Sequence, residues 1–371
     1  MAATAFDVLI IGAGIAGATV AAHLASERRV GLIEAEEQAG YHTTGRSAAI
    51  WMHNYGPSDV RTLTGLSRAF FEAPPPGFTE HPLFTPRAVV FLAPADQRAE
   101  FDQFLADGIG LATRTPDQVR EIVPALRPGY AAAAAIEPDA FDMDVATLHQ
   151  GFLRQLRAAG GQLALRSRTG AIERRAGLWH VRVSGGGEFN APVLVNCAGA
   201  WGDEVAAQAG IAALGLVPKR RTGVIIDPTP WEAAGWPMVN DIAQTWYIRP
   251  EARTKLMVSP ADTTPMHAHD VQPDELDVAT AIDRMQQALD IEVRRIEHSW
   301  AGLRTFAPDG SLAFGWDRAG EGFFWCVGQG GYGIQTSPAA GQLVADMIIG
   351  RDPGPAAAIL PAIDPSRFAT A

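Results

Sequence analysis

The sequence predicts an α/β fold in which a strand-rich domain is inserted into a domain built on a parallel sheet. Two observations support this prediction. Apolar strands alternate with helical segments near both ends of the chain, and β-rich runs gather in the stretches between them. The 371 residues suffice for two to three domains. We expect the parallel-sheet domain to comprise residues 1–73, 145–215 and 301–371, and the inserted domain residues 74–144 and 216–300.

The composition excludes several classes of protein. Hydrophobic residues make up 47% and charged residues 19%, which allows a large core. Because 30 Lys and Arg face 41 Asp and Glu, the net charge of −11 argues against broad binding to nucleic acid or anionic membranes. The two cysteines, Cys197 and Cys326, are too few for a disulfide framework. No run approaches a membrane span and no signal peptide precedes the first strand, so we expect a cytoplasmic protein without a transmembrane segment.

The first 35 residues contain a nucleotide-binding pattern. A strand-like run, residues 6–11, leads into Gly12-Ala13-Gly14-Ile15-Ala16-Gly17, then a helical segment, residues 15–26, and a second strand, residues 30–34. Gly12 permits a tight turn, Gly14 lets backbone N–H groups approach a pyrophosphate, and Gly17 allows close packing of helix and strand. Glu34 ends the unit, where it would accept hydrogen bonds from a ribose. This βαβ unit predicts a Rossmann-like dinucleotide-binding domain for FAD or NAD.

A second glycine-rich element lies near the C-terminus. Residues 323–327 are strand-like, residues 328–333 form a glycine loop, and a helical segment begins at Ile334. The positive end of such a helix suits an anionic or electron-rich group, which in a flavoprotein is one edge of the flavin ring. An ordinary turn between strand and helix is the alternative.

Other segments extend the two domains. A helix over 145–159, a strand over 193–197 and a helix over 203–209 are expected to enlarge the nucleotide-binding sheet. A strand over 88–92 and a helix over 97–106 belong to the inserted domain. With the runs 222–227, 245–249 and 255–259, they suggest one antiparallel sheet.

Six separated segments together resemble a known family. They are Gly12 to Gly17, Tyr41 to Ala49, Pro218 to Arg221, His269 to Pro273, Trp300 to Arg304 and Gln329 to Thr336. In this order they are similar to the D-amino acid oxidase family of FAD-dependent oxidoreductases, which includes glycine and sarcosine oxidases, and within it to D-arginine dehydrogenases. The resemblance implies a glutathione-reductase-type FAD-binding domain and an inserted substrate domain. It also implies hydride removal from the α-carbon of an amino acid, giving an imino acid and then a 2-keto acid.

The resemblance assigns FAD contacts to matching positions. They are Ala16, Glu34, Ala35, Thr43, Thr44, Gly45, Arg46, Ser47, Ala48, Thr169, Gly331, Tyr332, Gly333, Ile334, Gln335 and Thr336. Hydroxyls, a guanidinium and a flexible glycine in residues 44–47 also suit a pyrophosphate and the flavin edge. For Arg46 the alternative is a surface cation.

The resemblance also places the substrate. Arg221 and Arg304 would hold its carboxylate, and Tyr55 and Tyr247 would add hydroxyls, because an anion that leaves water needs fixed donors. The backbone C=O of Gly331 would hold the α-amine. We expect Tyr55, Tyr247 and Arg304 to orient the substrate in catalysis. Structural salt bridges are the alternative for the two arginines.

Three positions depart from the D-arginine dehydrogenase pattern. Val89 stands where those enzymes carry a glutamate that faces the substrate guanidinium, Ile50 stands at a histidine, and Met52 at a threonine. A buried guanidinium without its carboxylate is costly, so these residues predict a side-chain pocket for neutral or apolar D-amino acids. His53 could replace the missing histidine, and Trp246 could join the pocket.

Several alternatives stay open. The activity could be that of an oxidase for a small secondary amine acid of the sarcosine, glycine or proline type, an NAD-dependent dehydrogenase, or a flavin subunit that needs partner chains. The electron acceptor, O2, a quinone or another compound, is not specified. His267, His269 and Asp270 lie close in sequence, but a polar loop with this spacing predicts no metal site.

Overall fold

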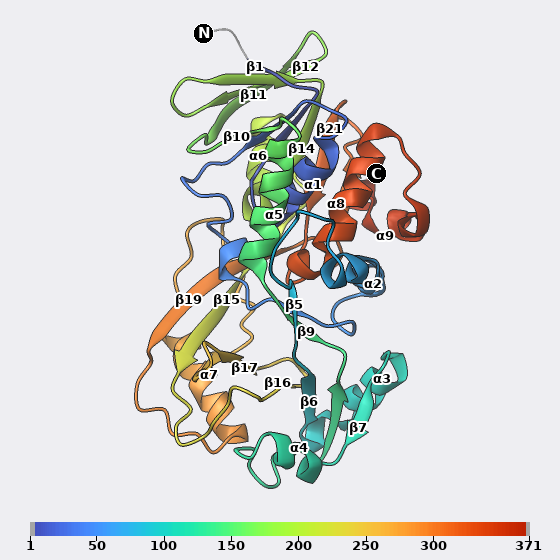
Figure 1. Ribbon diagram of the computed structural model, residues 1–371. Coiled ribbons are helices and arrows are strands. Elements are labelled where there is room, and N and C mark those ends of the chain that lie inside the picture. The colour runs from blue at the N-terminus through green and yellow to red at the C-terminus, as the bar shows by residue number, and fades with distance from the viewer. Residues whose placement is uncertain (1–3, 369–371) are drawn as a thin grey trace.

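A six-stranded sheet forms the centre of the first lobe in the computed structural model, which describes residues 4–368. Its strands run in the order β10-β3-β2-β14-β21-β20 (Gln162–Ala164, Val30–Ile33, Val8–Ile11, Val193–Asn196, Phe323–Val327, Ala313–Trp316). All neighbours are parallel except β20, which is antiparallel to β21. In Figure 1 this lobe contains both chain ends and lies above the second lobe.

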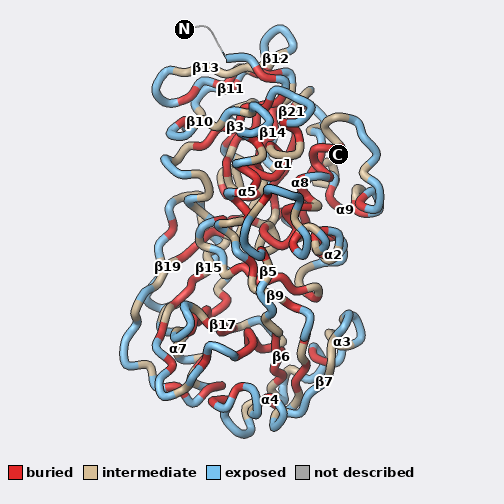
Figure 2. Tube along the Cα trace, in the orientation of Figure 1, coloured by how far each residue is buried: buried red, intermediate tan, exposed pale blue. Residues whose placement is uncertain are grey.

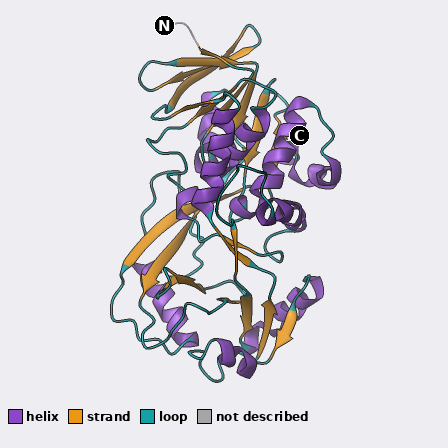
Figure 3. Ribbon diagram, viewed as in Figure 1, coloured by secondary structure: helices purple, strands orange, loops and turns teal. Residues whose placement is uncertain are grey.

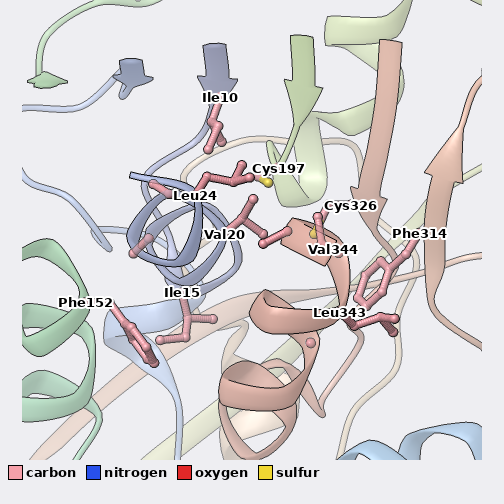
Figure 4. Packing of buried hydrophobic residues seen from close by; sticks show 14 of the residues in the cluster. Ile10, Ile15, Val20, Leu24, Phe152, Cys197, Phe314, Cys326, Leu343 and Val344 are labelled. Carbon is pink, nitrogen blue, oxygen red and sulfur yellow. The ribbon is translucent and has the colours of Figure 1, made fainter. Parts of the chain in front are cut away.

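Helices cover the six-stranded sheet because its central strands are apolar on both faces. Every residue of β2 and β21 is buried. Helix α1 (Ile15–Leu24) packs against α5 (Val145–Ala158) and α8 (Gly333–Ile349). Figure 4 shows Val20 and Leu24 of α1 between Ile10 of the sheet and Val344 of α8, with Phe152 of α5 alongside. The helices α2 (Ser58–Glu72), α6 (Gly202–Gln208) and α9 (Leu360–Ile363) complete the lobe.

The expected nucleotide-binding elements are confirmed, with ends that shift by a few residues. Strand β2 begins at Val8 rather than at residue 6, and α1 ends at Leu24 rather than at residue 26. Strand β21 matches the expected 323–327, and α8 begins one residue before Ile334. Strand β14 lies between β2 and β21, so the middle segment does enlarge the sheet.

The second lobe contains an eight-stranded sheet. Its order is β19-β15-β18-β17-β16-β6-β8-β7 (His298–Phe306, Val217–Ile226, Lys255–Ser259, Tyr247–Glu251, Met238–Asp241, Val89–Ala93, Ala133–Glu137, Ala112–Arg114). Helices α7 (Glu275–Ala288), α3 (Arg98–Asp107) and α4 (Pro116–Ile122) lie beside it. The strands are coloured orange in both lobes of Figure 3.

The expectation of a purely antiparallel sheet is wrong at one pair. Strands β6 and β16 are parallel, with Met238 opposite Val89 and Asp241 opposite Leu92. A parallel pair needs a long crossover between its strands, and β6 and β16 come from different inserted stretches of the chain. The sheet is therefore mixed, and β16 joins the two inserted stretches.

Two smaller sheets complete the fold. Strands β4, β9 and β5 (Ile50–Trp51, Phe141–Met143, Phe84–Pro86) form one between the lobes. Strands β1, β13, β12 and β11 (Thr4–Ala5, Glu188–Ala191, Leu178–Val183, Thr169–Arg175) form the other, beyond the six-stranded sheet. Figure 2 shows buried residues concentrated in the strands of both lobes. Within residues 4–368, no helix has the length and apolar character needed to cross a bilayer.

Candidate functional site: a dinucleotide cavity joined to an anion pocket

A cavity of about 420 Å³ lies where the parallel strands of the six-stranded sheet end. Its walls include Gly12 after β2, Glu34 after β3, Ala198 after β14 and Gly330 after β21. This is the edge at which open α/β sheets bind ligands, and the volume is in the range of small-molecule sites. Both glycine elements of the sequence therefore converge on one space.

The first glycine turn has the geometry that its motif predicts. Gly12 has a φ of +99°, and a Cβ there would lie 2.5 Å from the carbonyl oxygen of Cys197. A Cβ on Gly17 would lie 1.9 Å from the carbonyl oxygen of Gly12. Gly14 is the N-cap of α1 and lines the cavity. The backbone of this turn can therefore approach a ligand closely.

Glu34 lies at the adenosine-facing end expected of such a unit. Its Oε2 accepts a hydrogen bond from the N–H of Ala13 at 2.9 Å, and its Oε1 accepts one from the N–H of Glu36 at 3.0 Å. The residue is 9% exposed and lines the cavity. Since each carboxylate oxygen has a second lone pair, Glu34 is held in place and can still accept ribose hydroxyls.

The second glycine loop presents another helix start to the same cavity. Gly330 has a φ of +50°, and a Cβ there would lie 2.4 Å from the Phe306 ring. Tyr332, the N-cap of α8, makes no capping hydrogen bond with its side chain. Gly331, Gly333 and Ile334 line the cavity. Two helix N-termini thus face one space, an arrangement that suits an anionic dinucleotide.

The segment after Gly40 connects the first glycine turn to the second lobe. The hydroxyl of Thr44 accepts the N–H of Ile15 at 2.9 Å, and the hydroxyl of Thr43 donates to the carbonyl of Leu303 at 2.6 Å. A Cβ on Gly45 would lie 2.8 Å from the carbonyl oxygen of Gly40. These contacts hold residues 43–48 along the cavity wall.

Arg46 has partners that the sequence did not anticipate. Its guanidinium pairs with Asp270 and donates to the carbonyls of Val271 at 3.1 Å and Ala301 at 3.0 Å. These protein groups use donors that we expected to serve a phosphate or the flavin edge. Arg46 also lies over the Tyr41 ring. Arg46 therefore fastens the segment to the loop around residue 270.

Most residues assigned to FAD by resemblance line the larger cavity. They are Ala16, Glu34, Ala35, Thr43, Thr44, Arg46, Ser47, Ala48, Thr169, Gly331, Gly333 and Ile334. Gln335 lines a smaller cavity instead, and neither cavity is lined by Gly17, Gly45, Tyr332 or Thr336. The Thr336 hydroxyl, for example, donates to the carbonyl of Tyr332 within the helix.

A smaller cavity continues from the larger one into the second lobe. The two share Arg221, Tyr247, Arg304 and Gly331. Strands β15 and β19 pair with Arg221 opposite Gly302 and Arg304 opposite Lys219. This register puts the two arginines on one face as diagonal neighbours. The expected substrate residues thus meet where the two cavities join.

Neither arginine has an ionic partner among the residues that the structure describes. The Nη1 of Arg304 donates to the hydroxyl of Tyr55 at 3.1 Å, and the Nε of Arg221 donates to the carbonyl of Asp262 at 3.1 Å. Across residues 4–368, no carboxylate lies within 4.0 Å of either guanidinium. The alternative of structural salt bridges is therefore wrong. Two shielded cations without an anion form a site for an anionic ligand.

The titration of neighbouring groups reflects this excess of positive charge. Burial, together with the charge of Arg304, lowers the pKa of Arg221. Burial acts to raise the pKa of Tyr247, but the charges of Arg304 and Arg221 outweigh it and leave that pKa below its ordinary value. An incoming carboxylate would relieve this repulsion between the two arginines.

The side-chain end of the smaller cavity has an apolar wall. Ile50, Met52 and Phe91 line it. Val89 packs with these residues in one buried apolar cluster but does not line the cavity. Phe91, two residues later on the same strand, lines the cavity in its place. Trp246 is buried and does line the smaller cavity, and its indole N–H donates to the hydroxyl of Tyr130 at 2.8 Å.

His53 does not replace the missing pocket histidine. Its ring packs against α2, where a Cβ on Gly65 would lie 3.3 Å from its Cε1. It lines neither cavity. Burial, helped by the charges of Arg61 and Arg68, lowers its pKa.

Several cavity residues were not predicted from the sequence, among them Thr305, Asn240 and Arg249. The buried hydroxyl of Thr305 has no hydrogen-bond partner within the described chain, and this residue lines the larger cavity. Asn240 and Arg249 line the smaller one. Alternation along β16 and β17 could have grouped Asn240 with Met238, and Arg249 with Tyr247. Residues 4–368 contain no group of three potential metal ligands, His267, His269 and Asp270 included.

The family of the chain follows from comparison with known proteins. The family model described as "DAO: FAD dependent oxidoreductase" matches residues 7–347. The chain belongs to this family. FAD is accordingly its cofactor, and the two helix N-termini and Glu34 fit such a dinucleotide. The chain is thus an FAD-dependent oxidoreductase, and several of the proteins it is similar to carry the names of amino acid oxidases, dehydrogenases or deaminases.

Individual relatives of this DAO family chain share its full length at low identity. Glycine oxidase from Geobacillus kaustophilus is 26% identical over 361 residues, covering 92% of this chain and 93% of the relative. Its crystal structure matches with a TM-score of 0.82, covering 94% of this chain and 96% of that one. L-proline dehydrogenase from P. horikoshii matches with a TM-score of 0.83 at 21% identity, covering 99% and 98%.

Proposed function

We propose that this protein oxidises free amino acids with uncharged side chains, with D-amino acids as the preferred enantiomers. The observation that supports this proposal is the pair of guanidiniums, Arg221 and Arg304, which face the junction of the two cavities without an ionic partner in the described chain. A carboxylate at this position would be paired with both charges. The preference for D-amino acids rests on the sequence resemblance to D-arginine dehydrogenases.

The chain's own residues would orient the substrate rather than react with it. The carboxylate binds to Arg221 and Arg304, and the hydroxyl of Tyr55, 3.1 Å from the Nη1 of Arg304, holds that guanidinium in place. The carbonyl of Gly331, which lines both cavities, accepts a hydrogen bond from the neutral α-amine. FAD, when bound, accepts the hydride from the α-carbon. The amine lone pair then forms the C=N bond, and water hydrolyses the imino acid to the 2-keto acid and ammonia.

A cationic side chain is disfavoured at the far end of the smaller cavity. Arg249 lines this end, and its ion pairs with Asp142 and Glu251 occupy carboxylates that could otherwise pair with a substrate guanidinium or ammonium. Val89, at the position of the glutamate in D-arginine dehydrogenases, supplies no carboxylate. D-arginine and D-lysine should therefore be poor substrates.

A substrate screen with a dye as electron acceptor tests the proposal. Both enantiomers of leucine, methionine and phenylalanine are compared with D-arginine, while peroxide is monitored to identify an oxidase. We expect kcat/KM for D-methionine to exceed that for D-arginine by about 100-fold or more. A preference for D-arginine, or for L-amino acids, would contradict the corresponding part of the proposal.

An oxidase for a secondary amine acid is the second candidate. Two relatives carry the names glycine oxidase and L-proline dehydrogenase. The smaller cavity extends beyond the arginines to Met52, Phe91 and Met238, which is space that glycine would leave empty. Glycine, sarcosine and L-proline in the same screen separate the candidates. Turnover by the isolated chain would also exclude a flavin subunit that requires partner chains.

A further inference from the structure

Several polar residues that the proposed reaction does not use line the side-chain end of the smaller cavity beside apolar side chains. Gln244 is exposed, whereas Asn54, Asn240 and Arg249 are at least partly buried. A polar group whose hydrogen bonds are all made within the protein is part of the wall. One that keeps an open position can recognise a substrate. The three residues differ in this respect.

Asn54 is saturated by the protein. Its Nδ2 donates to the carbonyl of Ile109 and to the Oε2 of Glu137, both at 2.8 Å. Its Oδ1 accepts the N–H of Ile109 at 2.8 Å. Both amide hydrogens are used, and the amide oxygen is turned toward the protein. Asn54 therefore belongs to the wall.

Arg249 is compensated, although its charge remains at the cavity. Its Nε lies 3.2 Å from the Oδ1 of Asp142, and its Nη2 lies 3.4 Å from the Oε2 of Glu251. Its Nη1 donates to the carbonyl of Ala48. The charge of Arg249 is thus met by carboxylates of the protein, and the residue belongs to the wall.

Asn240 has half of its carboxamide open. It is 6% exposed, and its Nδ2 donates to the carbonyl of Val90 at 3.1 Å. Because a carbonyl can only accept, this bond fixes which end of the amide is nitrogen. No donor within residues 4–368 hydrogen-bonds to the Oδ1. Asn240 therefore presents a fixed acceptor at the cavity wall.

The strand register agrees with this assignment. Asn240 lies opposite Tyr247 in the β16–β17 pair, and Tyr247 lines both cavities. Met238, two residues earlier on β16, lines the smaller cavity as well, whereas Val239 between them packs into the core on the other face. Asn240 is thus the polar member of the cavity-facing set on β16.

We propose that Asn240 determines side-chain specificity by accepting a hydrogen bond from an uncharged O–H or N–H donor on the substrate. This inference rests on the proposed function and names its substrate class: neutral amino acids that carry such a donor, with glutamine as the probe. An apolar side chain of similar length, such as that of methionine, would cover the Oδ1 of Asn240 without bonding to it. A buried acceptor left unpaired disfavours that substrate.

The test compares kcat/KM for glutamine, methionine and alanine, each as the enantiomer that the enzyme turns over. We expect the wild-type protein to prefer glutamine to methionine by about tenfold, and Asn240→Leu to abolish or reverse that preference. Met238→Leu is the matched control. It alters the same strand face without removing a polar group, so it should change both values together and leave their ratio intact.

Either of two results would overturn the inference: a wild-type protein that prefers methionine, or an Asn240→Leu protein that binds FAD and keeps the wild-type ratio. If Asn240→Leu does not fold, the wild-type ratio alone decides. The result with alanine separates failure of the proposed function from failure of the proposed role of Asn240. Failure to oxidise alanine as well as the longer amino acids contradicts the proposed function. Turnover of alanine with no preference for glutamine contradicts only the role of Asn240.

Discussion

Gly331 and Tyr55 approach each other so closely that a Cβ on Gly331 would lie 2.6 Å from the Tyr55 hydroxyl. The same atom would lie 3.1 Å from the Nη1 of Arg304. A methyl group at position 331 therefore has to displace the two groups that we assign to the substrate carboxylate. The backbone at Gly331 does not have a positive φ, so contact rather than strain makes glycine necessary here.

Gly331→Ala should reduce kcat/KM by about 100-fold, because displacing positioning groups by about 1 Å has an effect of this size. Steady-state kinetics with the best substrate measures it. Gly235→Ala is the matched control, since a Cβ there meets no atom within 4 Å and its φ is not positive. Equal kinetics for the two variants would show that position 331 tolerates a side chain.

Substitution of Arg221 and substitution of its neighbour Arg220 should have opposite effects on thermal stability. Arg220 has carboxylate partners, with its Nη2 2.6 Å from the Oδ2 of Asp277. Arg221 has none in the described chain, and burial beside Arg304 lowers its pKa. Arg221→Met should raise the Tm of the substrate-free protein while reducing kcat/KM by about 100-fold or more. Arg220→Met should lower the Tm, because it leaves a carboxylate unpaired.

Thermal unfolding of both methionine variants, with FAD content as a measure of folding, provides the comparison. A fall in Tm for Arg221→Met as large as that for Arg220→Met would mean that Arg221 stabilises the fold. Such a result would contradict its assignment as a ligand-binding cation.

Glu137 fixes the segment that carries Tyr55. Its Oε1 accepts the N–H of His53 at 2.5 Å, and its Oε2 accepts the amide of Asn54 at 2.8 Å. Burial nevertheless raises the pKa of Glu137. A carboxyl whose pKa is raised by folding contributes stability below its unfolded pKa and loses it as the pH rises through the raised value. The free energy of unfolding of wild type minus that of Glu137→Gln should therefore fall with increasing pH in this window.

Urea unfolding across a pH series measures this slope. Asp139→Asn is the control of opposite sign, because hydrogen bonds from Arg68 lower the pKa of Asp139. Its contribution is present above the ordinary carboxyl pKa and is lost as the pH falls through the lowered value. Slopes of the same sign for the two variants would contradict the assignment.

Substitution of Glu34 should weaken the binding of FAD. Both of its oxygens accept backbone N–H groups, so Glu34→Gln would turn an amide NH2 toward one of these donors. We expect the Kd of FAD to rise by about 10- to 100-fold, as measured by flavin fluorescence on titrating the apoprotein. Glu37→Gln is the control, because Glu37 is exposed and pairs with Arg166 outside the cavity. Comparable losses for both variants would count against a role for Glu34 in binding.

The elements of the nucleotide-binding domain could be predicted from the sequence because the motifs that define them are local. Gly12, Gly17 and Glu34 lie within one βαβ unit, where spacing alone determines which groups meet. Strand β21 is a short apolar run followed by glycines, and it forms at the expected residues. The convergence of the two glycine elements could be predicted because both follow strands of one parallel sheet.

The substrate pocket was less predictable because it depends on contacts between distant segments. Alternation groups Asn240 with Met238, but the parallel pairing of β16 with β6 decides which other residues share their face. The partner of Arg46, Asp270, lies 224 residues away in the chain. An arginine at position 46 suggested an anionic ligand, whereas the fold shows that Arg46 pairs with the carboxylate of Asp270.

The two ends of the substrate pocket are built by different strands. The arginines that we propose to bind the carboxylate lie on β15 and β19, which pair with each other from Val217 to Ile225, whereas Asn240 and Arg249 lie on β16 and β17. Except for Tyr247 on β17, the proposed carboxylate-binding residues therefore lie on other strands than the residues that would distinguish one amino acid from another. New preferences could be engineered, or could arise by natural variation, through exchange of Met238 and Asn240 alone, with Tyr247 and the two arginines kept.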